Sequence, residues 1–361
     1  MKEIEELIEI SHRYGSDQDY VIAGGGNTSF KNDEYIWIKG SGTSLATIDA
    51  DGFVRLDRKK LKEIGRKAYP QDLILREAMV KEDLAAAVDD KPGKRPSVET
   101  SLHELLDYAY VVHTHPAKVN GLTCSVKARE KSAELFGEEV LFIEYINPGY
   151  TLFLKVFDEV KRYMLKFGNQ PKIIFLENHG VFVAADTTDE IDEIYRSVNE
   201  KLDARISVEP PSEEGGVTEG TFVFKGEKKV MLKRSSQLIS RFVSSEKEFA
   251  KVAAAFTPDH IVYCKAFYPF MDDASEIESV ISGFISEKGY WPRVAGVKGD
   301  GLIVLEDSRK SALTALEVYE DMLKTAVYAE NFGGAKPMTA EQIAFIDSWE
   351  VENYRRKVAK E

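Results

Sequence analysis

The chain has 361 residues, of which 43% are hydrophobic and 30% are charged, so it can form one large or two ordinary globular domains. Its formal net charge of −13 argues against nucleic acid and anionic membranes as partners, because both select clustered lysine and arginine. No stretch approaches the roughly 18 apolar residues that a membrane-spanning helix needs.

The N-terminal segment and the cysteines indicate the compartment. The sequence begins with MKEIEELIEISHRYG, which has acidic residues where a signal peptide needs a basic start and an apolar stretch, so we expect an amphipathic helix there. Cys124 and Cys264 are its 2 cysteines, and neither has a CxxC neighbour. We therefore expect small buried thiols in a protein of the reducing cytoplasm.

Predicted strands and helices alternate along the first half of the chain, which is typical of the α/β class. The glycine-rich turns GGGNTS and KGSGTS flank a predicted strand at 34–39, as in a hairpin, and a polar helical region follows at 58–79. Pro96 and Ser97 predict the start of the next helix, with Ser97 as N-cap, and this helix leads into the strand YAYVVHTHP. Further helices are expected near 127–135, 152–167 and 189–202, and further strands near 140–146 and in the run that contains His179.

The stretch VEPPSEEGGVTEG has the composition of a linker. It predicts a domain at 1–207, a linker at 208–220 and a second, smaller α/β domain at 221–361.

The second domain contains an apparent internal repeat. PKIIFLENHGVFVAADTTDEIDEIYRSVNEKL aligns without a gap with PRVAGVKGDGLIVLEDSRKSALTALEVYEDML, and YVVHTH resembles HIVYCK upstream. Self-similarity of this kind suggests duplication of a unit. In this alignment, Tyr263, Lys265 and Asp300 stand opposite three histidines of the first domain that are candidate metal ligands. We therefore expect the second domain to be a degenerate copy of the first that binds no metal. Chance similarity of two strand–turn–helix segments is the alternative, because the matching positions are mostly apolar.

Three of the 6 histidines lie in or beside apolar, strand-like runs, where histidine is usually scarce. His113 and His115 stand two residues apart, so on a strand their side chains point to the same face. His179 follows in IIFLENHGVFVAA and could supply a third imidazole from a neighbouring strand. Three nitrogen ligands with an open position are typical of a catalytic zinc site. A lone HxH would equally suit two ordinary polar residues.

A carboxylate precedes the histidine pair. Glu99 lies in the predicted first turn of the helix that feeds the HTH strand, where the helix N-terminus favours a negative charge. His103 is four residues further along, on the same helix face. Glu99 could instead be an ordinary first-turn charge, and His103 a histidine at the edge of the core with its hydrogen bonds satisfied.

The glycine-rich turns could bind an anion. GGGNTS offers backbone N–H groups and the side chains of Asn27, Thr28 and Ser29, and KGSGTS offers further hydroxyl groups. Neither has the spacing of a P-loop or of a dinucleotide fingerprint. Clusters of this composition are also common in simple turns.

The order of the motifs is more specific than any one of them. GGNTS, SGTS, PSVETSLH, VVHTHP, NPG and ENHG, in this order over residues 1–207, resemble the class II aldolase/adducin family. The resemblance implies a three-layer α/β/α domain. The closest likeness is to the aldolase part of bifunctional rhamnulose-phosphate aldolase/alcohol dehydrogenases, and it continues through 258–350 to a tryptophan-containing helix. The dehydrogenase part would follow, and without a dinucleotide fingerprint we expect no hydride transfer.

The resemblance also implies roles for particular residues. It gives His113, His115 and His179 as metal ligands and Glu99 as the catalytic acid/base. The implied phosphate-contacting positions are Gly26, Asn27, Ser41, Gly42 and Ser97. Val98 stands where fuculose-phosphate enzymes have a second serine, so one phosphate hydroxyl is absent.

The activity implied is reversible cleavage of a ketose 1-phosphate, of the rhamnulose or fuculose type, to dihydroxyacetone phosphate and an aldehyde such as L-lactaldehyde. The expected metal is Zn²⁺, with Mn²⁺ or Co²⁺ as alternatives. The family also uses a tyrosine acid, for which Tyr150 and the tyrosine-rich C-terminal segment are candidates. We expect a homo-oligomer, and a separate dehydrogenase is a possible partner.

Two other functions fit the same motifs. A sugar-phosphate 4-epimerase shares the metal and the carbon–carbon cleavage chemistry. A non-catalytic binding module like the adducin head would be expected to lose the histidines, and here all three are present together with Glu99.

Overall fold

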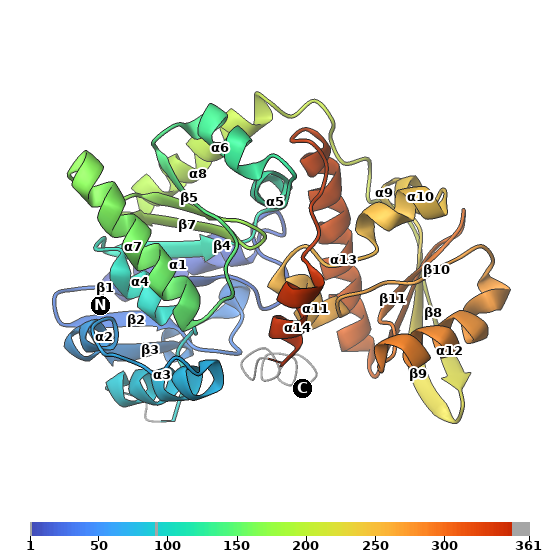
Figure 1. Ribbon diagram of the computed structural model, residues 1–361, viewed down its shortest axis with the longest axis horizontal. Helices are drawn as coiled ribbons and strands as arrows, with labels where there is room; N and C mark the ends of the chain where they lie inside the picture. Colours follow the sequence, from blue (N-terminus) through green and yellow to red (C-terminus); the bar gives the residue numbers. More distant parts are fainter. Residues whose placement is uncertain (1, 91–92, 349–361) are drawn as a thin grey trace. The chain divides into compact units, whose positions relative to one another are not determined.

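The structure, a computed structural model, describes residues 2–90 and 93–348, which form two compact units (Figure 1). Among the described residues, the first unit takes those up to Val119 and Arg129–Ala204, and the second takes Asn120–Ala128 and those from Arg205 on. Trp349 of the predicted C-terminal helix and Tyr354 of the tyrosine-rich segment lie outside the described residues.

The first unit is built on a seven-stranded sheet with the order β3-β2-β1-β4-β7-β6-β5. All neighbours in this sheet are antiparallel except β5 and β6, which run parallel. The strands are β1 (Asn27–Lys31), β2 (Tyr35–Lys39), β3 (Phe53–Asp57), β4 (Tyr110–Thr114), β5 (Val140–Ile143), β6 (Ile173–Leu176) and β7 (Gly180–Ala185). Strand β4, which carries the histidine pair, therefore lies at the centre of the sheet and is buried along its length.

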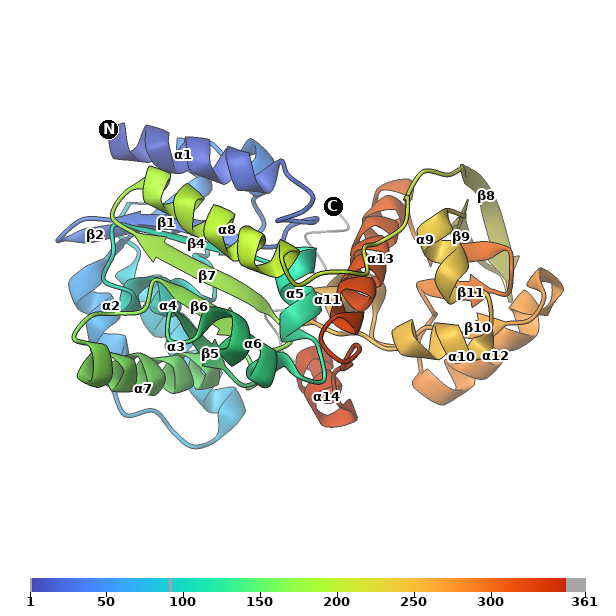
Figure 2. The same ribbon diagram turned by 90° about the horizontal axis from the view of Figure 1, so that it is seen from above.

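Helices cover both faces of this sheet, which confirms the three-layer α/β/α architecture (Figure 2). One face carries α1 (Lys2–Gly15) and α8 (Thr188–Asp203). The other face carries α2 (Arg58–Ile64), α3 (Leu73–Ala87), α4 (Thr100–Leu105) and α7 (Tyr150–Phe167). The connection from β4 to β5 contains α5 (Ala117–Thr123) and α6 (Ala128–Phe136). The apolar core beneath α2, α3, α4 and α7 includes Ile38, Val54, Val111, Phe153 and Phe182.

The polar helical region expected at 58–79 is two helices rather than one. Asp57 caps the start of α2 and Asp72 caps the start of α3, each with its carboxylate accepting backbone N–H groups. Gly65 and Pro70 lie between them, and a proline cannot continue a helix with its missing N–H group. The chain therefore folds back between the two helices.

The second unit has a five-stranded sheet with the order β10-β11-β12-β9-β8. Its strands are β8 (Val217–Phe224), β9 (Glu227–Arg234), β10 (Phe270–Met271), β11 (Val294–Val297) and β12 (Gly301–Glu306). Its helices are α9 (Gln237–Phe242), α10 (Glu246–Phe249), α11 (Pro258–Cys264), α12 (Ile277–Lys288), α13 (Arg309–Glu330) and α14 (Ala340–Ser348). Because β8 begins at Val217, the linker expected at 208–220 is shorter than predicted.

The two sheets share an order and a pattern of directions. The series β5-β6-β7-β4-β1 in the first corresponds to β10-β11-β12-β9-β8 in the second, with one parallel pair followed by antiparallel pairs in each. The aligned segments have the same bounds, since Ile173–Leu176 and Gly180–Ala185 correspond to Val294–Val297 and Gly301–Glu306. The hairpin register is also the same in both units.

One part of the predicted repeat is wrong. HIVYCK is not a strand but lies in helix α11, which starts with Pro258 in its first turn and a capping box between Thr257 and His260. The helix is buried on all sides, so its continuous apolar run has no helical period and looks like a buried strand in sequence. The strand that corresponds to β4 is β9, so Lys233 and Ser235, rather than Tyr263 and Lys265, stand opposite His113 and His115.

Candidate metal centre

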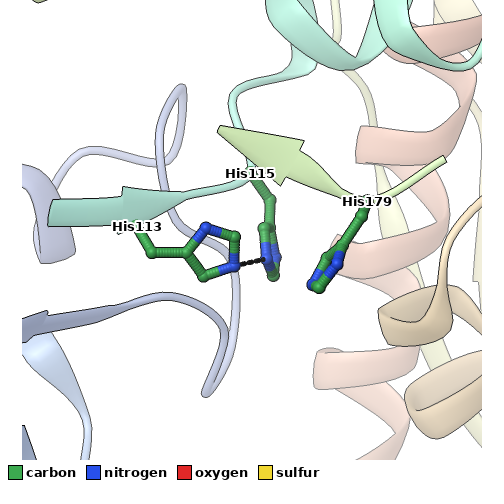
Figure 3. A group of neighbouring side chains, drawn as sticks. All are labelled: His113, His115 and His179. Atoms are coloured by element: carbon green, nitrogen blue, oxygen red, sulfur yellow. Dashed lines mark hydrogen bonds between the residues drawn. The ribbon is translucent and has the colours of Figure 1, made fainter. Parts of the chain in front are cut away.

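His113, His115 and His179 converge (Figure 3). One ring nitrogen from each lies within 4.8 Å of the other two. His113 is the second-last residue of β4 and His115 directly follows this strand, whereas His179 ends the turn between β6 and β7. The structure thus brings together the three predicted ligands, from two neighbouring antiparallel strands and their ends.

The turn before β7 places His179. Asn178, which is buried, has a left-handed φ of 54°, a conformation that asparagine tolerates better than most residues. Gly180 then passes close to the ligand strand, because a Cβ atom there would lie 2.5 Å from both the carbonyl oxygen of Thr114 and Cδ2 of His115. Only glycine leaves room for the His115 ring at this point.

The ring of His113 is fixed by its surroundings. Its Nδ1 lies 2.9 Å from the carbonyl oxygen of Val181, so this nitrogen carries the proton and donates to that oxygen. The ring stacks on Phe182 at 4.1 Å between centroids and is fully buried, and burial holds the pKa of His113 well below its usual range. Its Nε2 therefore keeps a lone pair and lies 2.9 Å from Nε2 of His115 (Figure 3).

Glu99 joins the cluster from the opposite side. Its Oε2 lies 3.4 Å from Nε2 of His113 and its Oε1 lies 3.6 Å from Nε2 of His179. Oε1 is buried and makes no hydrogen bond among the described residues. Burial alone would raise the pKa of Glu99, but the neighbouring histidines and the amide of Asn27, which donates to Oε2, lower this pKa below its usual range.

The predicted helix start needs correction. The N-cap of α4 is Glu99 and not Ser97, because the turn from Ser97 to Thr100 comes before the helix. Ser97 instead accepts a hydrogen bond from the backbone N–H group of Glu99. The Glu99 side chain does not cap the helix, and so its carboxylate is available to the histidines.

The glycine-rich turns lie beside the ligand strand and beside Ser97. Gly26 has a φ of 65°, and a Cβ atom there would lie 2.8 Å from the carbonyl oxygen of His113. Asn27 pairs with His113 across β1 and β4, and its amide donates to Oε2 of Glu99 at 2.6 Å. Among the predicted phosphate contacts in the described residues, Asn27 is thus the one whose side chain is hydrogen-bonded to the Glu99 carboxylate.

The glycine-rich turn KGSGTS is joined by backbone hydrogen bonds to the segment that contains Ser97. The backbone N–H group of Ser41 donates to the carbonyl of Arg95, and that of Ser97 donates to the carbonyl of Lys39. Ser41 and Ser97 therefore lie on paired segments, while Gly42 is exposed with a φ of 89°.

The far face of β4 supports the histidine pair. Thr114, between the two histidines, points to the opposite face, where its hydroxyl lies 2.7 Å from the hydroxyl of the buried Tyr195 on α8. The backbone N–H group of His115 donates to the carbonyl of Tyr20. This anchoring of the strand was not predicted, and Thr114 and Tyr195 look like ordinary core residues in sequence.

The candidate tyrosine of the sequence analysis belongs to the core. Tyr150 is 6% exposed, stacks on Phe153 and directs its hydroxyl to the carbonyl of Ile64 at 3.4 Å. Tyr145, in the same loop after β5, is linked to the segment that carries His179, because its backbone N–H group donates to the carboxylate of Glu177. The run EYINPGY contains both tyrosines, and the sequence alone did not separate them.

Comparisons with known proteins identify the family of the chain. Residues 5–198, more than half of the chain, match the Class II Aldolase and Adducin N-terminal domain. The chain belongs to this family. It is 26% identical to the uncharacterized oxidoreductase YuxG of Bacillus subtilis over 99% of its own length and 59% of that protein's length, so it spans well under two thirds of this relative.

Two solved structures are similar to a little over half of the chain. The N-terminal class II aldolase domain of a conserved Thermoplasma acidophilum protein is 27% identical, with a TM-score of 0.46, over 56% of this chain and 92% of that one. A sugar-phosphate aldolase from Thermotoga maritima is 14% identical, with a TM-score of 0.38, over 56% of this chain and 94% of that one. Among the described residues of this chain, no helix is long and apolar enough to cross a membrane.

Proposed function

We propose that the protein is a metal-dependent class II aldolase that reversibly cleaves a ketose 1-phosphate to dihydroxyacetone phosphate and an aldehyde such as L-lactaldehyde. The observation that supports this most directly is the convergence of three imidazoles with the carboxylate of Glu99 between them. Membership of the class II aldolase/adducin family supports the same reaction class.

The donor set suits a divalent metal held by His113, His115 and His179. The Nε2 atoms of the first two lie 2.9 Å apart. Oε1 of Glu99 lies 3.6 Å from Nε2 of His179, and it is buried without a hydrogen bond in the described part of the chain. Zn²⁺ accepts imidazole nitrogen readily, as do Mn²⁺ and Co²⁺. Such a metal supplies Lewis-acid stabilisation of the negative charge that develops on substrate oxygens when a carbon–carbon bond breaks.

The chain's own residues supply the proton transfers. Glu99 is ionised at neutral pH, so it can accept the proton of the three-carbon fragment and return it. Tyr145, whose pKa is raised by burial, stays protonated and is our candidate for the acid that protonates the aldehyde oxygen when the carbon–carbon bond forms. In cleavage the same proton moves the other way, from the substrate hydroxyl that becomes the aldehyde carbonyl to the tyrosine. The turns with Gly26, Asn27, Ser41, Gly42 and Ser97 are the proposed phosphate-binding region.

The central experiment assays aldehyde release from a panel of ketose 1-phosphates, with and without a chelator, using untagged protein of measured metal content. We expect one bound metal per chain and release that the chelator abolishes. Glu99→Gln should lower turnover about 10²–10⁴-fold while the metal content stays unchanged. Near-normal turnover of this variant, or wild-type protein without stoichiometric metal, would contradict the proposal.

The same assay separates the other candidates. A sugar-phosphate 4-epimerase would convert one ketose phosphate to its epimer and release no aldehyde. Unphosphorylated ketoses belong in the panel, because Val98 replaces a serine of the fuculose-phosphate enzymes. An added alcohol dehydrogenase reports L-lactaldehyde, and co-purification of such an enzyme tests the proposed dehydrogenase partner.

A further inference from the structure

A chain of buried hydrogen bonds runs beneath Glu99. The hydroxyl of Ser29 lies 2.7 Å from Nδ1 of His103, and Nε2 of His103 is hydrogen-bonded to Oδ1 of Asn27. The amide nitrogen of Asn27 then donates to Oε2 of Glu99 at 2.6 Å. His103 and Ser29 are fully buried and Asn27 is 6% exposed, so solvent has little access to any of these links.

The chemistry of the groups fixes the direction of every bond. The amide nitrogen of Asn27 donates to Oε2 of Glu99, so the amide oxygen faces His103. His103 therefore carries its proton on Nε2. Burial lowers the pKa of His103 to about 3, so the ring is neutral and its Nδ1 accepts from the hydroxyl of Ser29.

The backbone and ring of His103 are held in place. Its backbone N–H group donates to the carbonyl of Glu99 at 3.1 Å, and its own carbonyl accepts from the ammonium group of Lys31 at 2.5 Å. The ring packs at 5.4 Å between centroids against Phe182, which also stacks on the ring of His113. The imidazole thus has one orientation available toward Asn27.

We propose that His103 is a positioning residue that fixes the amide of Asn27, and that Asn27 serves mainly to aim the Glu99 carboxylate at the histidine cluster. For its effect on turnover this inference rests on the proposed function. It revises the role of Asn27, which the family resemblance implies to be a phosphate contact. Both ends of the Asn27 amide are engaged by protein groups, which leaves one N–H group for any other partner.

Removing the N–H donor of His103 would disturb the side-chain amide of Asn27. The buried oxygen of Asn27 would lose its hydrogen bond, and an unsatisfied buried acceptor is destabilising. Rotation of the amide would relieve this only by turning its oxygen toward Glu99, where two acceptors repel each other. In either case the Glu99 carboxylate loses the hydrogen bond that it accepts from the Asn27 amide.

A matched pair of variants tests the hydrogen bonds directly. His103→Gln places an amide nitrogen near the position of Nε2, whereas His103→Met has a similar length and no donor. In metal-free protein we expect ¹⁵N spectra to show His103 with its proton on Nε2. We also expect the side-chain amide signals of Asn27 to keep their shifts in His103→Gln and to move in His103→Met. A proton on Nδ1, or unchanged Asn27 signals in His103→Met, would overturn the inference.

Kinetics supply the second arm. His103→Met should lower kcat about 100-fold, as a misplaced catalytic group does, while KM and inhibition by inorganic phosphate stay within about 2-fold. His103→Gln should recover most of that loss. A rise in KM and weaker phosphate inhibition, with kcat unchanged, would instead show that the network serves phosphate binding and overturn the inference.

The spectra and the kinetics test the hydrogen-bond chain and the proposed function separately. If wild-type protein cleaves no ketose phosphate, the proposed function is wrong, and the spectra still decide whether the chain of hydrogen bonds exists. If His103→Met does not fold, Ser29→Ala removes the donor to Nδ1 and leaves the ring in place. We expect that variant to shift the His103 tautomer equilibrium and to lower kcat, and no change in either would count against the inference.

Discussion

His113 keeps its proton on Nδ1 because the carbonyl of Val181 accepts from it, and this single contact turns the other nitrogen toward the cluster. Metal ligands of this kind commonly depend on such a partner for their orientation. The contact comes from the backbone of β7, so side-chain substitutions at Val181 leave it in place. At the scale of the residue, the site therefore depends on backbone positions as much as on the imidazoles.

The burial of His103 leads to a prediction about how the stability of the folded protein depends on pH. Its pKa is about 3 in the folded protein and near 6.5 in the unfolded chain, so between these values the unfolded chain binds the extra proton. Its stabilising contribution is complete above pH 6.5 and is lost as the pH falls toward 3. Metal-free wild-type protein should lose about 1.4 kcal/mol per pH unit more than His103→Gln in this window.

Urea denaturation of both proteins at several pH values between 4 and 7 measures this difference. Each titration keeps a chelator present, so that metal release does not contribute. Parallel curves for the two proteins would contradict the neutral, buried state of His103.

The close packing around Gly180 leads to a prediction about the metal affinity of the candidate centre. A methyl group at this position would lie 2.5 Å from Cδ2 of His115 and from the carbonyl oxygen of Thr114, so Gly180→Ala should push the ring out of the cluster. We expect metal affinity to fall at least 10-fold in isothermal titration calorimetry. Gly283→Ala is the control. Gly283 lies in α12, and a Cβ atom added there would have no neighbouring atom within 4 Å outside the helix backbone, so this substitution should stabilise the protein by about 0.5–1 kcal/mol.

At the scale of the element, sequence patterns located most helices and strands of the first unit. The paired histidines and the apolar runs around them were sufficient to predict that His113 and His115 lie together, because the strand period alone aligns residues two positions apart. The orientation of Glu99 was not predictable, since it depends on a turn between Ser97 and Thr100 that shifts the helix start. The partner of His103 was equally hidden, because Asn27 is distant in sequence and meets it only where α4 packs on β1.

Element α11 shows a different limit. Every side chain of its central turn is buried, so no polar stripe marks the helical period, and the sequence pattern favoured a strand. Its capping box was present in the sequence, in Thr257 and His260, and it was the better guide to the secondary structure.

The shared strand order leads us to propose that the second unit is a degenerate copy of the first. In both units a glycine at the start of the final strand lies against a backbone carbonyl of the neighbouring strand: Gly180 against Thr114, and Gly301 against Arg234. The positions that correspond to the ligands are Lys233, Ser235 and Asp300.

A graft tests this correspondence. Lys233→His, Ser235→His and Asp300→His, combined in one variant, should create a second metal site if the two backbones match. We expect the metal content, measured by mass spectrometry, to rise by about one equivalent over wild type. The same substitutions made one at a time are the control, and an unchanged metal content in the triple variant would contradict the proposal.

At the scale of the whole molecule, each unit has an apolar core of its own, one around Phe153 and Phe182 and one around Ile281 and Ile303. A ligand stabilises the state to which it binds, and the candidate metal centre lies in the first unit. We therefore expect separate unfolding transitions in calorimetry, only one of which moves to lower temperature on addition of chelator.

Assignment of that transition uses the histidine variants. His179→Ala should lower the chelator-sensitive transition and remove its response, and leave the other in place. A single transition that shifts as a whole would contradict independent unfolding of the units.

Strand β4 has a further consequence for how this protein can be tuned. Its ligand-bearing face and its opposite face share one backbone, and Thr114 fastens that backbone to Tyr195 between the two histidines. Changes on α8, a helix that contributes no ligand, can thus tilt the strand and alter the spacing of the imidazoles. We therefore propose that substitutions in the outer layer can adjust the candidate metal centre while its three histidines stay the same.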